Sequence, residues 1–194
     1  MHTFQVTVGV SNRHLHLSED HIRELFGEGY CLTNKKDLSQ PGQFACEETV
    51  TLVGPKGSIE RVRILGPARQ ESQVELSFTD AIKLGLNVPV RDSGNLENTP
   101  GIEIRNGDKN IRLDRGAIAA MRHIHATEEE ALKFGLEDKD IVKVVVNGSR
   151  GGEFHNVLVR VKPTYALDFH IDTDEANALG IKNGDLVTVV VEDR

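Results

Sequence analysis

The chain is poor in the residues that mark several common protein classes. It contains no tryptophan and only two cysteines, and 5% of its 194 residues are aromatic. Cys31 and Cys46 form no C-x-x-C motif, and one potential disulfide is weak support for an oxidising compartment, so we expect both thiols to stay reduced. The sequence also lacks an apolar run of about 18 residues and a secretory signal peptide. These absences predict a cytoplasmic protein with no membrane partner.

The chain also has fewer basic residues than acidic ones. Lys and Arg number 23 against 30 Asp and Glu, which gives a formal net charge of -7. Binding to nucleic acid requires clustered Lys and Arg that neutralise phosphates, so the acidic balance argues against a nucleic-acid partner. A glycine-rich phosphate loop, a G-x-S-x-G elbow and an activated-cysteine motif are missing as well. Any chemistry must therefore depend on metal ions and arginine rather than on a protein nucleophile.

Strand patterns dominate the segments that are present. FQVTVGV, TVTLVGPKGSIERVRILG and DLVTVVVE combine β-branched residues with turns that contain glycine. The helical segments between such strands are short. We therefore expect a mainly β fold.

An internal repeat organises the chain. Residues 125–146 align without a gap on residues 170–191, and each copy contains a potential ligand, an N-cap, a two-turn helix, a glycine and a strand. Two further copies occur in the first half of the chain. The four predicted N-caps are Ser18, Ser77, Thr127 and Asp172, and the glycines predicted to end the helices are Gly27, Gly85, Gly135 and Gly180. The parallel order of these copies in the two halves predicts two pseudo-symmetric β-barrel domains capped by short α-helices.

The repeat selects six potential metal ligands. The position two residues before the cap is His16, Glu75, His125 and His170 in the four copies, and His14 and His123 stand two residues earlier in the first and third. Residues i and i+2 of a strand point to the same face with Cβ atoms roughly 6–7 Å apart, so each H-x-H pair can converge on one ion. A catalytic zinc ion takes three protein ligands and keeps one position open. The sequence thus offers two such sets: His14, His16 and Glu75, and His123, His125 and His170.

Some alternatives remain open for these residues. A single H-x-H pair is more often a surface or core pair than a metal site, and a duplicated ancestor could simply have kept polar residues at the domain junction. Arg69 lies six residues before Glu75, and its planar guanidinium suits an oxyanion or phosphate near a metal. On local grounds a surface arginine explains Arg69 equally well. Lys56 and Arg63 could form a cationic strip, although spacing alone favours solvated side chains.

Four separated motifs carry a resemblance to a known family. VSNRHLHLS, LGPAR followed by QVELS, MRHIHAT, and DFHIDTDEAN resemble, in the same order and over essentially the full chain, the propanediol-utilisation type of phosphotransacylase, the phosphate propanoyltransferases. The resemblance implies transfer of a propanoyl or acetyl group between coenzyme A and inorganic phosphate. It implies two Zn²⁺ per chain, at a site between two β-barrels, and it leaves a homodimer open.

The resemblance also implies roles for individual residues. His14, His16 and Glu75 would hold the zinc that faces the coenzyme A sulfur, and Arg69 would be the catalytic, phosphate-binding residue. Residues 1–12 would join 121–194 in one barrel, and 13–120 would form the other with an insertion at about 27–47. The implied coenzyme A contacts are Val10, Ser11, Asn12, Lys56, Arg63 and Asn177.

One departure from the family concerns location, and two other functions stay open. Family members packaged inside bacterial microcompartments carry an amphipathic N-terminal extension, whereas His14 follows only 13 residues, so we expect a free cytosolic enzyme. A zinc-dependent hydrolase of a thioester or phosphate ester would use the same ligands. A non-enzymatic binding module is the other alternative, because helix–Gly–strand repeats such as ALGIKNGDLVTV also occur in small DNA-binding barrels.

Overall fold

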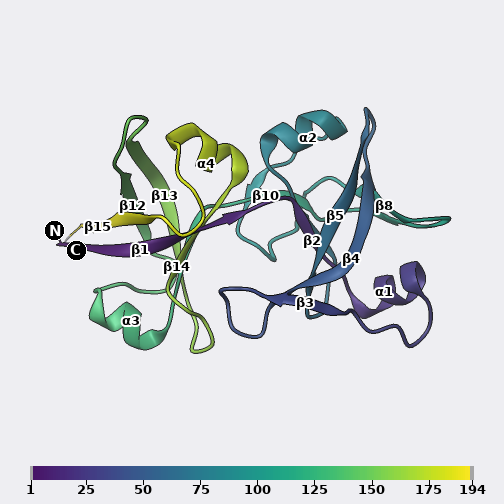
Figure 1. The fold of residues 1–194 in the computed structure, drawn as a ribbon, viewed down its shortest axis with the longest axis horizontal. Coiled ribbons are helices and arrows are strands. Elements are labelled where there is room, and N and C mark those ends of the chain that lie inside the picture. The colour runs from purple at the N-terminus through teal and green to yellow at the C-terminus, as the bar shows by residue number, and fades with distance from the viewer. Residues whose placement is uncertain (1, 193–194) are drawn as a thin grey trace. The chain divides into compact units, whose positions relative to one another are not determined.

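The computed structural model describes residues 2–192, which divide into two compact units (Figure 1). The first unit contains the described residues as far as Ser11, the short segment Ser39–Pro41, and those from Met121 onward. The second contains Asn12–Leu38 and Gly42–Ala120. The chain therefore leaves the second unit at Ser39 and returns to it at Gly42.

The first unit is a closed barrel of six strands with two short helices. The strands pair in the order β1-β14-β11-β13-β12-β15, and β1 pairs with both β14 and β15 to close the ring. Alternate residues of β1 point inward, and its Phe4, Val6 and Val8 are buried in the barrel core. The elements are β1 (His2–Ser11), β11 (His123–Ala126), α3 (Glu128–Lys133), β12 (Ile141–Val146), β13 (Gly152–Val161), β14 (Asp168–Asp172), α4 (Thr173–Leu179) and β15 (Leu186–Val191).

The second unit is a curled sheet that forms a half-barrel. Its strands pair in the order β7-β10-β6-β2-β5-β4-β8-β9, with β3 added on β4. A separate apolar core that includes Leu15, Leu52 and Ile64 fills it. The elements are β2 (His14–His16), α1 (Glu19–Phe26), β3 (Asn34–Asp37), β4 (Phe44–Val53), β5 (Ser58–Gly66), β6 (Gln73–Glu75), α2 (Phe78–Leu84), β7 (Val90–Arg91), β8 (Ile102–Asn106), β9 (Lys109–Leu113) and β10 (Ala117–Ala120).

The structure confirms the mainly β fold with short helices, and it refines the second barrel. Among residues 2–192 the strand order of the second unit ends at β7 and β9, which do not pair with each other. At one end of this order, β7 spans only Val90–Arg91 and pairs with β10 alone. The first sheet closes, whereas the second only curls.

The helices begin at the predicted caps. The Ser18 and Ser77 hydroxyls accept hydrogen bonds from the backbone N–H groups of His21 and Asp80. Thr127 and Asp172 form complete capping boxes with the glutamates three residues later. Gly27, Gly85 and Gly180 cap the ends of α1, α2 and α4, whereas α3 is capped by Phe134 and the positive φ falls on the next residue, Gly135.

Two further features of the structure concern the cysteines and the length of the helices. Cys31 is an exposed free thiol and Cys46 is a buried one. No helix within residues 2–192 has the length and apolar character needed to cross a membrane.

Candidate metal centres

The first cluster lies on one antiparallel strand pair of the second unit. His14 and His16 are on β2 and Glu75 is on β6, and the register places His14 opposite Glu75. One ligand atom of each of the three side chains lies within 4.8 Å of the others. His14 Nε2 is 3.3 Å from a Glu75 carboxylate oxygen, and both histidines are buried. The structure thus brings together the first predicted ligand set.

The charges within the first cluster act differently on the protonation of its three members. Burial, together with the nearby His14 and Arg69, lowers the pKa of His16 to about 3, so its ring is neutral near pH 7. Burial alone would raise the pKa of Glu75, but His14 outweighs it and holds that pKa well below the ordinary value. Burial opposes protonation of His14, yet the Glu75 carboxylate raises its pKa. A neutral imidazole and a carboxylate are both ligands that zinc accepts.

Hydrogen bonds also orient the rings of this cluster. His14 Nδ1 is 2.8 Å from the Asn12 carbonyl oxygen, to which it donates, and Nε2 faces a Glu75 carboxylate oxygen at 3.3 Å. His16 Nδ1 is buried and has no hydrogen-bond partner among residues 2–192. A buried ring nitrogen without a partner is costly in a protein interior, and a metal ion at this position would satisfy it.

Arg69 lies beside the first cluster. Its backbone N–H donates to the Leu17 carbonyl at 2.9 Å, and its Nη1 donates to the Ser93 hydroxyl at 3.2 Å. Its positive charge contributes to lowering the pKa of each of the three cluster residues. An anion bound to this half-buried guanidinium would therefore lie next to the cluster.

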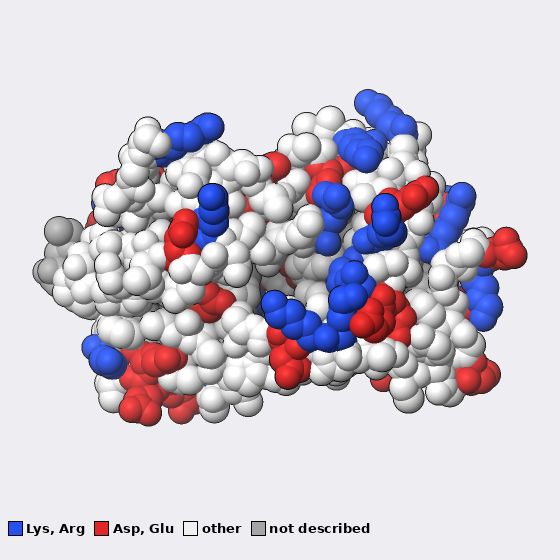
Figure 2. Space-filling model, in the orientation of Figure 1, with Lys and Arg blue, Asp and Glu red and all other residues white. Residues whose placement is uncertain are grey.

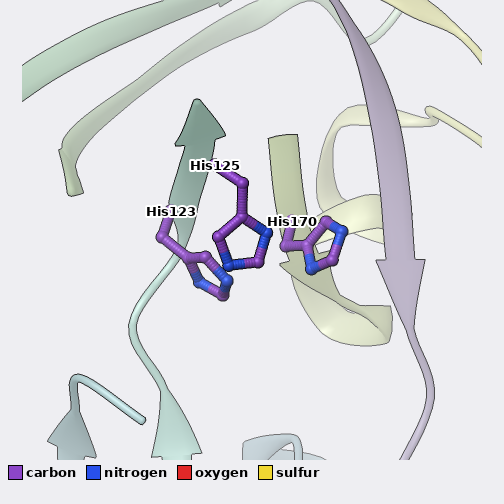
Figure 3. Close-up of side chains that lie close together, drawn as sticks. All are labelled: His123, His125 and His170. Carbon is purple, nitrogen blue, oxygen red and sulfur yellow. The ribbon is translucent and has the colours of Figure 1, made fainter. Parts of the chain in front are cut away.

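The second cluster occupies the corresponding strand pair of the first unit. His123 and His125 are on β11, His170 is on β14, and His123 stands opposite His170. Figure 3 shows the three rings gathered together, with centroids 4.6–5.2 Å apart. One nitrogen of each ring lies within 4.8 Å of the others. Three imidazoles from two neighbouring strands are a ligand set typical of zinc.

The second cluster repeats the orientation of the first. His123 Nδ1 is 2.8 Å from the Met121 carbonyl oxygen, as His14 Nδ1 is from the carbonyl of Asn12. In each H-x-H pair the first ring is therefore fixed by the backbone two residues earlier. This leaves Nε2 as the nitrogen that could bind a metal ion in both.

The predicted coenzyme A contacts are divided equally between the units. Val10 and Ser11 end β1, and Asn177 is exposed on α4, all in the first unit. The second unit contains Asn12, Lys56 and Arg63.

Within the second unit these three residues have different surroundings. Lys56 lies exposed in the turn between β4 and β5, where its backbone N–H donates to Leu84. Arg63 pairs with His14 across β5 and β2, and its Nη1 donates to the carbonyls of Cys46 and Glu47 at 2.8 and 2.7 Å.

The surface carries mixed charge. On the face shown in Figure 2, Lys and Arg side chains lie among Asp and Glu. Exposed ion pairs such as Lys35–Glu47 at 2.9 Å and Arg23–Asp20 at 2.8 Å contribute to this mixture. Mixed charge of this kind gives no support to a DNA-binding module, which needs clustered basic side chains.

Comparison with known proteins identifies the family. The family model PTAC, phosphate propanoyltransferase, matches residues 7–182, a range that includes both clusters and Arg69. The chain belongs to the phosphate propanoyltransferase family. The resemblance found in the four sequence motifs is thereby confirmed, and the chain is an acyltransferase.

Several curated relatives carry the family name. The phosphate propanoyltransferase of Thermotoga maritima is 56% identical over 186 residues, which cover 95% of this chain and 89% of the relative. That of Sebaldella termitidis is 54% identical over 177 residues, covering 91% and 84%. That of Enterococcus faecalis is 53% identical over 182 residues, covering 94% and 85%. The similarity extends over both units.

Sequence reasoning missed four polar residues, three of which contact a cluster residue directly and one of which contacts it through Asp168. Gln73 and Asp168 precede Glu75 and His170 by two positions and contact them directly. The alignment of repeats does contain a signal for these two, because both occupy the position that holds the first histidine in the H-x-H copies. Ser93 and Ser39, which contact Gln73 and Asp168, have no such signal in the sequence.

Proposed function

We propose that this phosphate propanoyltransferase interconverts acyl-CoA and phosphate with acyl phosphate and coenzyme A, using one Zn²⁺ at each cluster. The observation that carries the proposal is the pair of three-ligand clusters, one of which has Arg69 beside it. Propanoyl and acetyl groups are both candidate substrates. Coenzyme A is a substrate in one direction and a product in the other.

The side chains of both clusters suit zinc. Each set provides three imidazole or carboxylate ligands, which leaves one position for substrate or water. The neutral His16 ring and the unpartnered His16 Nδ1 support this assignment. Zinc bound at these residues would supply Lewis acidity toward the thioester carbonyl and charge compensation for the departing thiolate.

Arg69 would hold the attacking phosphate. A guanidinium binds two phosphate oxygens at once. The hydrogen bond from Arg69 Nη1 to Ser93 restricts the orientation of the guanidinium before substrate arrives, and the backbone N–H of Arg69 is held by Leu17. A free phosphate oxygen attacks the thioester carbonyl carbon, a C–O bond forms, and the C–S bond breaks. The electron pair of that bond leaves on the sulfur of coenzyme A. Arg69 thus orients the nucleophile, so the chain itself need not form an acyl-enzyme.

The coenzyme would contact the six residues that the family resemblance implies. Val10, Ser11 and Asn177 are its proposed contacts in the first unit, and Asn12, Lys56 and Arg63 are those in the second. The exposure of Lys56 and Asn177 supports roles at the coenzyme's polar groups, because cationic and amide side chains bind phosphate and nucleotide groups.

The decisive experiment varies phosphate. The purified protein is incubated with propanoyl-CoA or acetyl-CoA, with and without phosphate, while free thiol and acyl phosphate are measured. Transfer requires phosphate and gives equal amounts of both products. Thiol release without phosphate would instead indicate a thioester hydrolase, and elemental analysis that finds no zinc in the active protein would contradict the metal assignment.

A further inference from the structure

Each cluster has a polar side chain two residues before its third ligand. Gln73 precedes Glu75 on β6, and Asp168 precedes His170 on β14. Residues i and i+2 of a strand share a face, so each polar side chain lies beside the ligand that follows it. Both are almost completely buried: Gln73 is 1% exposed and Asp168 is 5% exposed. Most polar atoms of buried side chains are hydrogen-bonded in folded proteins, so the partners of these two side chains carry information.

In the second unit, Gln73 holds the Glu75 carboxylate. Its Nε2 donates to one Glu75 oxygen at 2.5 Å and to Ser93 Oγ at 2.8 Å. Its Oε1 accepts from the Gly94 backbone N–H at 2.8 Å, which fixes the orientation of the amide. Ser93 Oγ also donates to the same Glu75 oxygen at 3.2 Å. The other carboxylate oxygen is left facing His14.

In the first unit, Asp168 holds the His170 ring. Its Oδ2 is 2.9 Å from His170 Nε2 and accepts from Ser39 Oγ at 2.6 Å. Its Oδ1 is buried without a hydrogen-bond partner among residues 2–192, so the hydrogen bonds of this carboxylate converge on Oδ2. A proton on His170 Nε2, donated to Asp168, leaves Nδ1 as the nitrogen available to a metal ion.

The surroundings of Asp168 keep this contact in place. Gln40 donates to the Ala166 carbonyl at 2.9 Å and accepts from the Ala166 N–H at 3.2 Å, which anchors the segment that carries Ser39. Gly9 lies against the pair, since a Cβ there would be only 2.7 Å from His170 Cδ2 and 3.0 Å from Asp168 Oδ2. The segment Ser39–Pro41 is therefore held in the first unit by the hydrogen bonds of Ser39 and Gln40. The Ser39 partner, Asp168, in turn contacts the candidate ligand His170.

The partner is chemically matched to the ligand in each unit. Glu75 is an acceptor and has an amide donor beside it, whereas His170 donates through Nε2 and has a carboxylate acceptor beside it. We propose that Gln73 and Asp168 are equivalent positioning residues, each of which orients the third metal ligand of its unit and is itself held by a serine from a distant loop. The proposal rests on the zinc centres of the proposed function. Partners of this kind contribute about 10- to 100-fold in metal affinity.

Two nearly isosteric variants test the proposal. Gln73→Met removes the donor beside Glu75, and Asp168→Asn removes the charge beside His170. The zinc content and the dissociation constant of each zinc are measured on the full chain by competition with a chromophoric chelator. We expect each variant to bind one zinc about 10- to 100-fold more weakly and the other with wild-type affinity. The double variant should weaken both.

The controls separate positioning from a general structural role. Glu71→Gln and Glu153→Gln remove exposed charges from the second and first units, and should bind both zinc ions as the wild type does. The absorption bands of the cobalt-substituted protein should change in Asp168→Asn and Gln73→Met but not in the controls. If Gln73→Met does not fold, Ser93→Ala replaces it, because it removes the hydroxyl that holds Gln73.

Each outcome has a distinct meaning. Wild-type protein with two zinc ions and unchanged affinities in both variants would overturn the positioning role alone. Equal loss of both zinc ions in a single variant would also overturn it, since the effect would then not be specific to one unit. Wild-type protein that binds no zinc would overturn the metal centres of the proposed function instead.

Discussion

The two units place their candidate ligands on the same kind of strand pair but build different sheets around it. In the first unit β11 and β14 belong to a closed six-stranded barrel, whereas β2 and β6 of the second belong to a sheet that stays open. The register is nevertheless the same, with His123 opposite His170 and His14 opposite Glu75. The geometry of three ligands is thus set by one antiparallel pair and does not depend on closure of the sheet.

The chemistry of the two clusters differs more than their geometry. The first contains a carboxylate and has Arg69 beside it, whereas the second consists of three imidazoles. A divalent ion would keep one more unit of positive charge with the second set, because its ligands are all neutral. If a divalent ion binds at each set, the second would be the stronger Lewis acid, whereas the first has the positive charge of Arg69 beside it.

Removal of one cluster should have the largest effect. His14→Ala with His16→Ala, or His123→Ala with His125→Ala, is expected to reduce zinc from two ions per chain to one and to lower kcat/KM by at least about 10³-fold, because a catalytic ion loses two of three ligands. Elemental analysis and steady-state kinetics measure this. Two zinc ions retained in either double variant would contradict the corresponding ligand set.

Arg69 lies in the second unit, beside the first cluster. Arg69→Ala should lower kcat/KM for phosphate by about 10²- to 10³-fold, with a smaller effect on zinc content, because it removes the donor for the phosphate charge. Arg69→Lys should keep only part of the wild-type kcat/KM for phosphate, since an ammonium group cannot bind two phosphate oxygens in the planar geometry of a guanidinium. The exposed Arg115, paired with Glu71, provides the control Arg115→Ala. Wild-type kcat and phosphate KM in Arg69→Ala would exclude the assignment.

Gly9 tests how tightly the first unit packs around His170. Gly9→Ala places a Cβ within 2.7 Å of His170 Cδ2, so the ring or the strand must shift. We expect a loss of about 1–3 kcal/mol in the free energy of unfolding and weaker zinc binding in the first unit only. Denaturant unfolding and chelator competition measure both effects. Thr7→Ala, at an exposed position of the same strand, is the matched control, and equal effects of the two would refute this packing.

Acidification should destabilise the second unit through Glu48 and stabilise the first unit through Glu175. In the second unit burial would raise the pKa of Glu48, but hydrogen bonds from its own backbone N–H, from Tyr30 and from Thr33 hold that pKa below its ordinary value. The stabilising effect of Glu48 is therefore present above the ordinary pKa and lost as pH falls through the folded value. In the first unit burial raises the pKa of Glu175 above 4.5, so its cost at neutral pH is relieved as pH falls through the folded value.

Residue-resolved hydrogen exchange of the metal-free protein between about pH 6 and 4 measures the stability of each unit. The wild type is compared with Glu48→Gln and Glu175→Gln. Glu48→Gln should reduce the acid sensitivity of the second unit. Glu175→Gln should increase that of the first. A change of the same sign in both variants would contradict the opposite pKa shifts.

Much of the local structure was predictable from the sequence. The helix starts depend on contacts within four residues, so Ser18, Ser77, Thr127 and Asp172 could be recognised without knowing the fold. The end of α3 shows the limit of such reasoning, because its cap is Phe134 and the predicted glycine follows it. Zinc binding and the coenzyme contacts remain predictions.

The sequence by itself determined the caps, the H-x-H pairs, the six candidate ligands and the family, because these depend on short spacing and on a repeat that can be aligned. Only the tertiary structure decided that β2 pairs with β6 and β11 with β14, that one sheet closes, and that serines reach the clusters. Ser39 and Asp168 are 129 residues apart in the chain, yet they share a hydrogen bond. Strand pairing and buried hydrogen bonds join segments with no fixed spacing, so their partners are chosen by packing of the whole fold.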